Sequence, residues 1–424
     1  QEKVEFNAKL CIMNMAVHGL NAKIISGDEA NSFYHDAHNL DGSCDYVMAN
    51  PPFNVDKVKA ESTQNAGRLP FGLPGVNPKK EISNANYLWI SYFYSYLNDT
   101  GRAGFVMPAS ATDSGNRDRE IRKQLIQTGD VDCMISVTNN FFYKVTLPCS
   151  LWFFDKGKKE ILKDKVLFID SRNYYIVVDR TLNEWSEWQM KNLNAIVWLH
   201  RGEIDKYKKL LSDYRSQIIT DCKSLDAEFG SLPVLLKDHN DKLTSLRKQL
   251  ADITEPANDV NQLLPLNELL KRYTTELNAS VKEFNEYGEG LGKIEAKEYA
   301  KSIDQAASTW DSFKKKVSAR VEEVVSHIKA CRTVIKEAKW LTEKFGEGTY
   351  VDVPGLCKAA SIDEIREKNW SLTPGAYVGA VPIEETEDNF EERIAEIHKE
   401  LLSLHSEATM FMDIISGNFE ELGI

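Results

Sequence analysis

The hydrophobic period of this 424-residue chain changes near residue 200, and that change restricts the folds open to it. Before this point, short apolar runs of strand length alternate with polar or helix-like connections, as an α/β sheet requires. Beyond it, apolar residues recur every three or four positions, which is the period of a helix. We therefore expect an α/β domain followed by a mainly α-helical region.

The individual elements follow from the same patterns. Strands are expected over 22–26, 45–49, 104–107, 131–137, 147–154 and 166–169. A helix over 6–18 has the apolar stripe Phe6, Leu10, Met13 and Val17, and an aromatic-rich helix with a buried face is expected over 86–97. Residues 54–85 form a long loop containing Lys57, Lys59, Arg68, Lys79 and Lys80. Helical stripes at 263–284 and 317–341 are expected to be helix-packing surfaces, with a coiled-coil partner surface as the alternative.

One tetrapeptide, Asn50-Pro51-Pro52-Phe53, directly follows the apolar run 45–49. In open α/β sheets, ligands bind at the carboxyl ends of strands. The Asn50 side-chain oxygen and the Pro51 carbonyl can together accept both hydrogens of a planar amine, whose delocalised lone pair makes it a poor nucleophile. Pro51 has no N–H to compete, and its fixed φ helps hold that carbonyl. The pattern thus favours methylation of adenine's exocyclic nitrogen or of a carboxamide nitrogen.

Phe53 adds a flat apolar surface to this motif. An aromatic ring stacked on an extruded base contributes about 1–3 kcal/mol. The alternative interpretation of the whole tetrapeptide is a strand that ends at a proline turn.

Charge and composition leave a nucleic-acid partner open. The net charge is −12, but residues 381–424 hold 12 acidic side chains against only Arg393 and Lys399, so the other residues together carry about −2. The 7 cysteines contain no C-x-x-C pair, which indicates a reducing cytosol and no zinc site, and the His35/His38 spacing does not predict a metal site. No apolar run is long enough to span a membrane.

Several segments, in order, resemble the modification subunit of a type I restriction-modification system, a family of S-adenosylmethionine-dependent DNA adenine-N6 methyltransferases. They are Gln1-Glu2 with Ala8-Lys9 and 13–16, the strand and loop 45–54, the strand 101–108, Phe141-Phe142-Tyr143 with 147–154, and Asn369, Leu372, Pro374-Gly375 and Tyr377-Val378 near the far end. The resemblance covers residues 1–170 and 365–415.

This resemblance implies roles for particular residues. Asn50, Pro51, Pro52 and Phe53 would form the catalytic loop, with Asn50 also next to the cofactor, S-adenosylmethionine. Glu2 would accept the hydroxyls of the cofactor's ribose, and Asp28 would lie near its adenine. Without such roles, Glu2 would be a terminal charge and Asp28 a helix N-cap.

The resemblance also implies a fold and a division of the chain. The family's Rossmann-like sheet has the strand order 3-2-1-4-5-7-6. Its first strand and glycine-rich cofactor loop have no counterpart before Glu2, so we expect a sheet incomplete on its N-terminal side, with strands 3 and 4 unpaired on facing edges. The glycine clusters at 288–293 and 345–348 follow no apolar strand and are interpreted as helix ends. The expected regions are a partial catalytic core (1–175), a helical extension (176–345) and a C-terminal segment with a partner-binding helix (346–424), in which Phe390, Ile394, Ile397, Leu401 and Leu404 form a stripe.

The partners that the resemblance implies are DNA and a specificity subunit docked on the helical part, with a restriction subunit as a further candidate. It also implies two modification subunits per complex and a place in the cytoplasm of a bacterium or archaeon. Two alternatives stay open: a protein glutamine-amide methyltransferase with a similar tetrapeptide, and a truncated, inactive chain that only assembles with partners.

Overall fold

The computed structural model describes residues 1–142, 146–232, 236 and 241–380, together with the single positions 398, 401, 405, 409 and 412. The chain divides into two compact units, Gln1–Gly379 and Ala380–Ile424. Most of the predicted final helix, including Phe390, Ile394, Ile397 and Leu404, lies outside the described residues, as does Tyr143. Everything below concerns the first unit.

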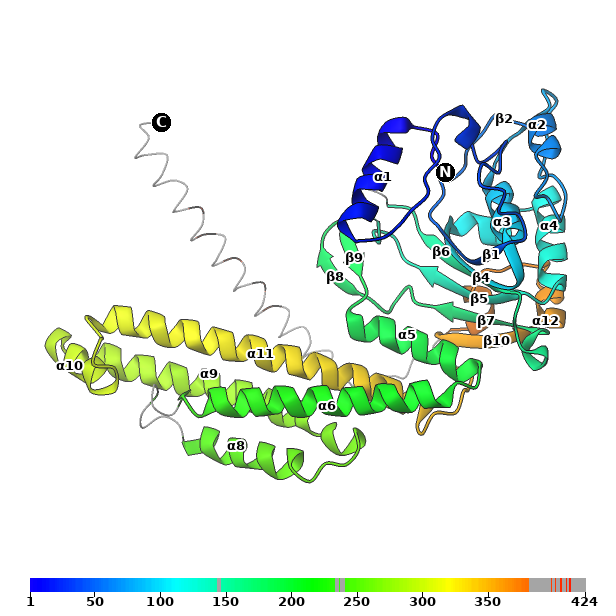
Figure 1. Cartoon of the computed structure of the whole chain (residues 1–424). Helices are drawn as coiled ribbons and strands as arrows, with labels where there is room; N and C mark the ends of the chain where they lie inside the picture. Colours follow the sequence, from blue (N-terminus) through cyan, green and yellow to red (C-terminus); the bar gives the residue numbers. More distant parts are fainter. Residues whose placement is uncertain are drawn as a thin grey trace, which may run out of the picture. The chain divides into compact units, whose positions relative to one another are not determined.

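A six-stranded mixed sheet is the centre of this unit (Figure 1). Its strand order is β1-β4-β6-β5-β7-β10. The strands are β1 (Cys44–Ala49), β4 (Leu97–Pro108), β6 (Cys149–Asp155), β5 (Val131–Val137), β7 (Lys165–Asp170) and β10 (Cys357–Ser361). Two small two-stranded sheets accompany it: β2 (Val58–Lys59) with β3 (Glu81–Ile82), and β8 (Ile176–Asp179) with β9 (Leu182–Glu184).

The strand directions confirm the predicted α/β fold class. β1 and β4 are parallel, as are β5 and β7, while β6 runs antiparallel to both β4 and β5. Reading β1, β4, β6 and β5 as strands 4, 5, 7 and 6 reproduces the second half of the expected order 3-2-1-4-5-7-6. The carboxyl ends of β1, β4, β5 and β7 consequently lie along one edge of the sheet.

β1 is the outermost strand on its side and pairs only with β4 among the described residues. On one face of β1 the side chains are exposed, with Tyr46 77% and Met48 91% exposed. The predicted strand over 22–26 is wrong: that segment makes a single parallel bridge, between Glu2 and Ser26. A strand requires a continuous row of backbone partners, and residues 22–26 have only this one.

Helices cover both faces of the sheet. One face packs against α3 (Asn86–Ser95) and α4 (Asn116–Gln127), together with α12 (Ile362–Glu367) and α13 (Gly375–Val378) from the far end of the chain. The other face of β5 and β7 packs against α5 (Glu187–His200), whose first turn has a capping box between Ser186 and Gln189. The C-terminal residues 357–378 therefore belong to the core of the sheet, and the strand among them was not predicted.

The first helix differs from expectation in its packing. α1 (Glu5–Val17) occupies nearly the predicted range, but its apolar stripe is uncovered: Phe6 is 68% and Val17 84% exposed. The loop 54–85 contains, besides β2 and β3, the short helix α2 (Ala60–Asn65).

The helical region consists of long helices packed along their apolar stripes (Figure 1). They are α6 (Ile204–Phe229), α8 (Asp241–Thr254), α9 (Leu266–Gly290), α10 (Lys293–Ile303) and α11 (Trp310–Phe345). Every residue of the predicted stripe Val317, Val321, Val324, Ile328, Cys331, Ile335, Ala338 and Leu341 is buried. The predicted helix-packing surface is confirmed, and the long apolar core keeps the region together.

Both glycine clusters are helix ends, as predicted. α9 ends at Gly290 and α10 begins at Lys293, while α11 ends at Phe345, just before Gly346. Neither cluster is a phosphate-binding loop, because neither connects a strand to a helix.

Gly288 allows two helices to approach closely, which yields a stability prediction. A Cβ atom at this position would lie 1.9 Å from Cζ2 of the Trp310 side chain. Gly288→Ala is therefore expected to lower the free energy of unfolding by about 1–3 kcal/mol, as overpacked cores do. The midpoint of urea unfolding, followed by tryptophan fluorescence, measures this change.

Gly290→Ala is the matched control, because a Cβ there meets nothing within 4 Å. Since alanine is a better helix former than glycine, this variant should be as stable as the parent or slightly more so. Equal midpoints for the two variants would contradict the proposed close packing.

Candidate active site

The tetrapeptide Asn50-Pro51-Pro52-Phe53 leaves the sheet at the carboxyl end of β1. Asn50 and Pro52 are exposed, Pro51 is buried and Phe53 is half-buried. Because Ala49 is paired with Phe105, Asn50 lies beside the last residues of β4, 106–108. The loop therefore lies at the edge where open α/β sheets bind their ligands.

Three asparagines hold the far end of this loop against the N-terminus of α3. Asn54 is in the left-handed region, with φ 55°, which asparagine tolerates better than most residues. Its backbone N–H donates to Oδ1 of Asn86 at 2.9 Å, and Nδ2 of Asn86 donates back to Oδ1 of Asn54 at 2.9 Å. Nδ2 of Asn84 donates to the same Asn54 oxygen at 3.1 Å. Asn86 is only 3% exposed, whereas Asn54 is exposed, so the Asn86 side of this reciprocal pair is shielded from water.

These asparagines are functional candidates that the sequence interpretation missed. Asn84 and Asn86 were seen only as the beginning of an aromatic helix. The available signal was the run Ser83-Asn84-Ala85-Asn86, because asparagine amides at a helix start form hydrogen bonds with nearby groups of the chain.

A cavity of about 450 Å³ opens beside Asn50 on the sheet face opposite α3. Its walls are the exposed faces of β1, β4 and β6, with Met48, Gly104, Val106, Leu151 and Phe153 among them. Gly104 lies close to the Phe153 ring, since a Cβ at this position would be 3.2 Å from that ring, which is a tight contact. The cavity is apolar, with one polar side chain at its edge, which suits a flat ring with a single hydrogen-bonding group.

The predicted cofactor residues Glu2 and Asp28 lie near each other and away from Asn50. Glu2 bridges Ser26, two residues before Asp28, and its backbone N–H donates to the Ile25 carbonyl at 3.0 Å. Its carboxylate Oε1 accepts the Val4 amide at 2.8 Å. Asp28 is exposed at the start of a short 3₁₀ helix, 28–30. Among the described residues, no hydrogen bond or shared cavity joins either carboxylate to Asn50.

The basic loop is less basic at its surface than the sequence suggests. Lys57, Lys59, Lys79 and Lys80 are exposed, but Arg68 is only 6% exposed. Its guanidinium lies over the Tyr92 ring, 4.3 Å from the centroid. Four lysines of this loop, without Arg68, are therefore available to a negatively charged partner near the candidate site.

The fold and the loop together define an α/β protein with a methyltransferase-type strand order and with the tetrapeptide Asn50-Pro51-Pro52-Phe53 at its ligand edge. A family model described as N-6 DNA Methylase matches residues 1–216, which is half of the chain. The chain therefore belongs to the N-6 DNA methylase family.

Known relatives agree with this assignment. The type I restriction enzyme MjaIX methylase subunit of Methanocaldococcus jannaschii is 38% identical over 186 residues, covering 44% of this chain and 32% of the relative. The HindI methylase subunit of Haemophilus influenzae is 33% identical over 186 residues, covering 43% of this chain and 40% of the relative. The chain thus spans about a third to two fifths of the length of these relatives.

A solved type I restriction-modification methyltransferase subunit from Streptococcus thermophilus aligns over 46% of this chain and 40% of its own length, with 22% identity and a TM-score of 0.41. The fold assignment made above follows from the strand order itself. Within the part of the chain that the structure describes, each helix is too short or too polar to cross a membrane.

Proposed function

We propose that this chain carries the amine-binding half of an S-adenosylmethionine-dependent DNA adenine-N6 methyltransferase, the modification subunit of a type I restriction-modification system. The observation that carries the proposal is the position of Asn50-Pro51-Pro52-Phe53 at the ligand edge of the sheet, in a member of the N-6 DNA methylase family.

The proposed chemistry follows from the atoms that the loop offers. Oδ1 of Asn50 and the carbonyl oxygen of Pro51 accept the two hydrogens of the adenine amine, which favours a pyramidal nitrogen with its lone pair directed at the methyl donor. The nitrogen then forms a bond to the methyl carbon as the bond from that carbon to sulfur breaks. The amine loses one proton to solvent. Phe53 stacks on the base, which offsets part of the few kcal/mol that base extrusion costs.

S-adenosylmethionine supplies an electrophilic methyl group on a positively charged sulfur. The residues present fit this cofactor at its ribose end. Oε1 of Glu2 accepts only the Val4 amide, and no hydrogen bond to Oε2 occurs among the described residues, so that oxygen can accept a ribose hydroxyl. The bridge between Glu2 and Ser26 brings the chain near Asp28 beside Glu2, which supports the proposal that Asp28 would contact the adenine of the cofactor.

The proposed partners are DNA, a specificity subunit and a restriction subunit, with two modification subunits in the complex and a cytoplasmic location in a bacterium or archaeon. The exposed Lys57, Lys59, Lys79 and Lys80 near the catalytic loop support a DNA partner, because contacts to phosphates supply much of the affinity for DNA. The division at residues 175 and 345 stays a prediction.

The family match distinguishes the proposed function from a glutamine-amide methyltransferase but not from an inactive assembly subunit. A glutamine-amide methyltransferase would bind its amide nitrogen through the same two oxygen acceptors. The matched family is described as N-6 DNA Methylase, which favours adenine as the substrate. An inactive assembly subunit differs in one measurable property, which is binding of the cofactor.

A calorimetric titration of S-adenosylmethionine into this chain tests that property. We expect a Kd of about micromolar order, which corresponds to roughly −8 kcal/mol. Glu2→Gln should weaken binding about tenfold or more, since hydrogen bonds to a charged group contribute about 1.5–3 kcal/mol. Glu5→Gln, at the exposed start of α1, is the control and should bind as the parent does. Absence of binding would support the inactive-subunit alternative.

A further inference from the structure

Arg122 of α4 is a buried cation without a close counter-charge. The side chain is 1% exposed, and its one ion pair within the described residues is with Asp113, 3.9 Å from Nη2, whose own side chain is 67% exposed. A guanidinium removed from water costs several kcal/mol unless other groups replace its hydration. The contacts that replace hydration here come from three separate parts of the chain.

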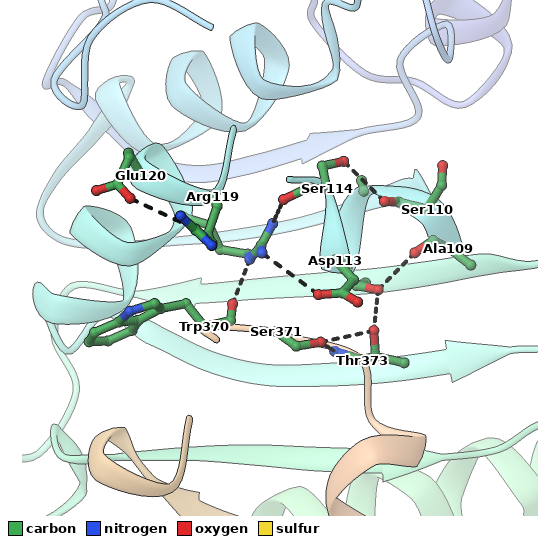
Figure 2. A network of polar contacts seen from close by, with 12 residues as sticks. Ala109, Ser110, Asp113, Ser114, Arg119, Glu120, Trp370, Ser371 and Thr373 are labelled. Atoms are coloured by element: carbon green, nitrogen blue, oxygen red, sulfur yellow. Dashed lines mark hydrogen bonds and ion pairs between the residues drawn. The ribbon is translucent and has the colours of Figure 1, made fainter. Parts of the chain in front are cut away.

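Those contacts are hydrogen bonds to neutral oxygens. Nη1 of Arg122 donates to the Ser114 carbonyl at 2.8 Å and to the Tyr87 hydroxyl at 2.8 Å, and Nε donates to the Trp370 carbonyl at 2.5 Å. Figure 2 shows Ser114, Asp113 and Trp370 arranged around one guanidinium group, whereas the ion pair of Arg119 is with Glu120. The fork shape of arginine allows one side chain to bond all three segments at once.

Two of these segments also bond each other directly. The Leu372 N–H donates to the Thr112 carbonyl at 2.8 Å, and the hydroxyls of Thr112 and Thr373 are 2.7 Å apart. The Tyr377 hydroxyl donates to the Ser371 carbonyl at 2.5 Å, which fixes the turn between them. The segment 369–378 is thus attached to the loop 109–115 that follows β4 directly at Leu372 and Thr373, and at Trp370 through Arg122.

The loop 109–115 flanks the candidate active site. It leaves the sheet from β4, the strand beside β1, at the same edge as Asn50. Two consecutive residues of α3 connect the two loops: Asn86 bonds Asn54, and the hydroxyl of Tyr87 donates to the Ala111 carbonyl at 2.7 Å. Because Tyr87 also accepts from Arg122, the first residues of α3 connect the end of the catalytic loop, through Asn86, with Trp370, through Tyr87 and Arg122.

We propose that Arg122 is a positioning residue of this site, and that it fixes the loop 109–115 and the segment 369–378 on the N-terminus of α3. The proposal deepens the proposed function and rests on it for the identity of the substrate. The space between the catalytic loop and the loop 109–115 is where a methyl acceptor must enter. Holding both loops on adjacent residues of one helix keeps the width of that space constant when the acceptor arrives.

Arg122→Lys, compared with Arg119→Lys, isolates this role. Both variants keep the positive charge and lose the forked guanidinium. Only at position 122 does that fork form bonds to three segments at once, so only Arg122→Lys should disturb them. Hydrogen exchange of the chain without any ligand is the first measurement. The Leu372 amide and the amides of 109–115 should exchange about tenfold faster in the Arg122 variant, corresponding to the loss of one or two hydrogen bonds, with no change for Arg119→Lys.

Methyl transfer by the complex of modification and specificity subunits is the second measurement, with DNA free of N6-methyladenine as substrate. Arg122→Lys should lower kcat about tenfold or more and leave KM for DNA unchanged, since a misplaced loop affects the reacting geometry. The concentration of active sites is measured by active-site titration, and kcat is calculated from that concentration. A smaller folded fraction therefore does not imitate a lower kcat.

Thr373→Val keeps the proposal testable if Arg122→Lys does not fold. It removes the hydroxyl contact with Thr112 and leaves Arg122 in place, so exchange in 109–115 and 369–373 should rise by a smaller factor. Unchanged exchange in the folded variants would overturn the positioning role, whatever the activity. Faster exchange with an unchanged kcat would show a purely structural contact and would also overturn it. Parent protein inactive on DNA would instead count against the proposed function alone.

Discussion

Replacing Asn50 by alanine is expected to abolish methyl transfer to DNA while leaving DNA binding intact. The side chain is exposed at the end of β1 and offers the amide oxygen that accepts an amine hydrogen. Removing one preorganised hydrogen-bonding group at a reacting centre costs roughly 100-fold to 1,000-fold in rate. Single-turnover transfer of a labelled methyl group, measured in the complex with the specificity subunit, gives this rate directly.

Asn65→Ala is the control for Asn50→Ala, because Asn65 is an exposed asparagine at the end of α2. Its methyl-transfer rate should equal that of the parent. A normal rate in the Asn50 variant would show that the loop is a proline turn without catalytic function, and the central proposal would be wrong.

Asn86→Ala is expected to have the second-largest effect, acting through the position of the loop. It removes both reciprocal hydrogen bonds with Asn54 and leaves the Asn54 N–H and Oδ1 without these partners. Asn54 is exposed and its Oδ1 keeps the bond from Asn84, so the loss is that of two hydrogen bonds of about 0.5–1.5 kcal/mol each, and the urea midpoint should fall. The rate of methyl transfer should drop by roughly 100-fold, which is the effect of a displacement of about 1 Å at a reacting group.

Ser83→Ala provides the comparison for Asn86→Ala, since Ser83 is exposed three residues earlier in the same connection. Both its stability and its activity should match the parent. If Asn86→Ala were destabilised but fully active in its folded fraction, the asparagine pair would be a structural element only.

Much of the fold followed from local patterns. β5 was predicted at its observed bounds, because a strand buried on both faces is mostly apolar, here in five of seven residues, and this pattern can be seen without knowledge of its neighbours. The buried stripe of α11 was visible for a similar reason, since the helical period repeats over ten turns. The position of Asn50 at the ligand edge followed from one strand and two prolines.

The features that could not be predicted depend on contacts between distant residues. Residues 22–26 have the composition of a strand but only a single bridged partner, between Ser26 and Glu2. The local sequence does not reveal how many backbone partners a segment finds in the fold. Conversely, β10 contains Lys358 and two alanines, a weak strand pattern, and forms because β7 offers it an antiparallel edge. Arg122 looked like any surface arginine of an amphipathic helix. Its burial requires Trp370, which lies 248 positions further along the chain.

The bare side of β1 has a practical consequence. The outer backbone groups of β1 lack partners among the described residues, and its Tyr46 and Met48 side chains are exposed. Such an edge strand can form backbone hydrogen bonds with a strand of another molecule. Asp45, which precedes Tyr46, is the one charged residue of β1, and its charge opposes the pairing of identical edges. At high concentration, purified chains will accordingly tend to join edge to edge, and dilute, salt-poor solutions will keep them apart.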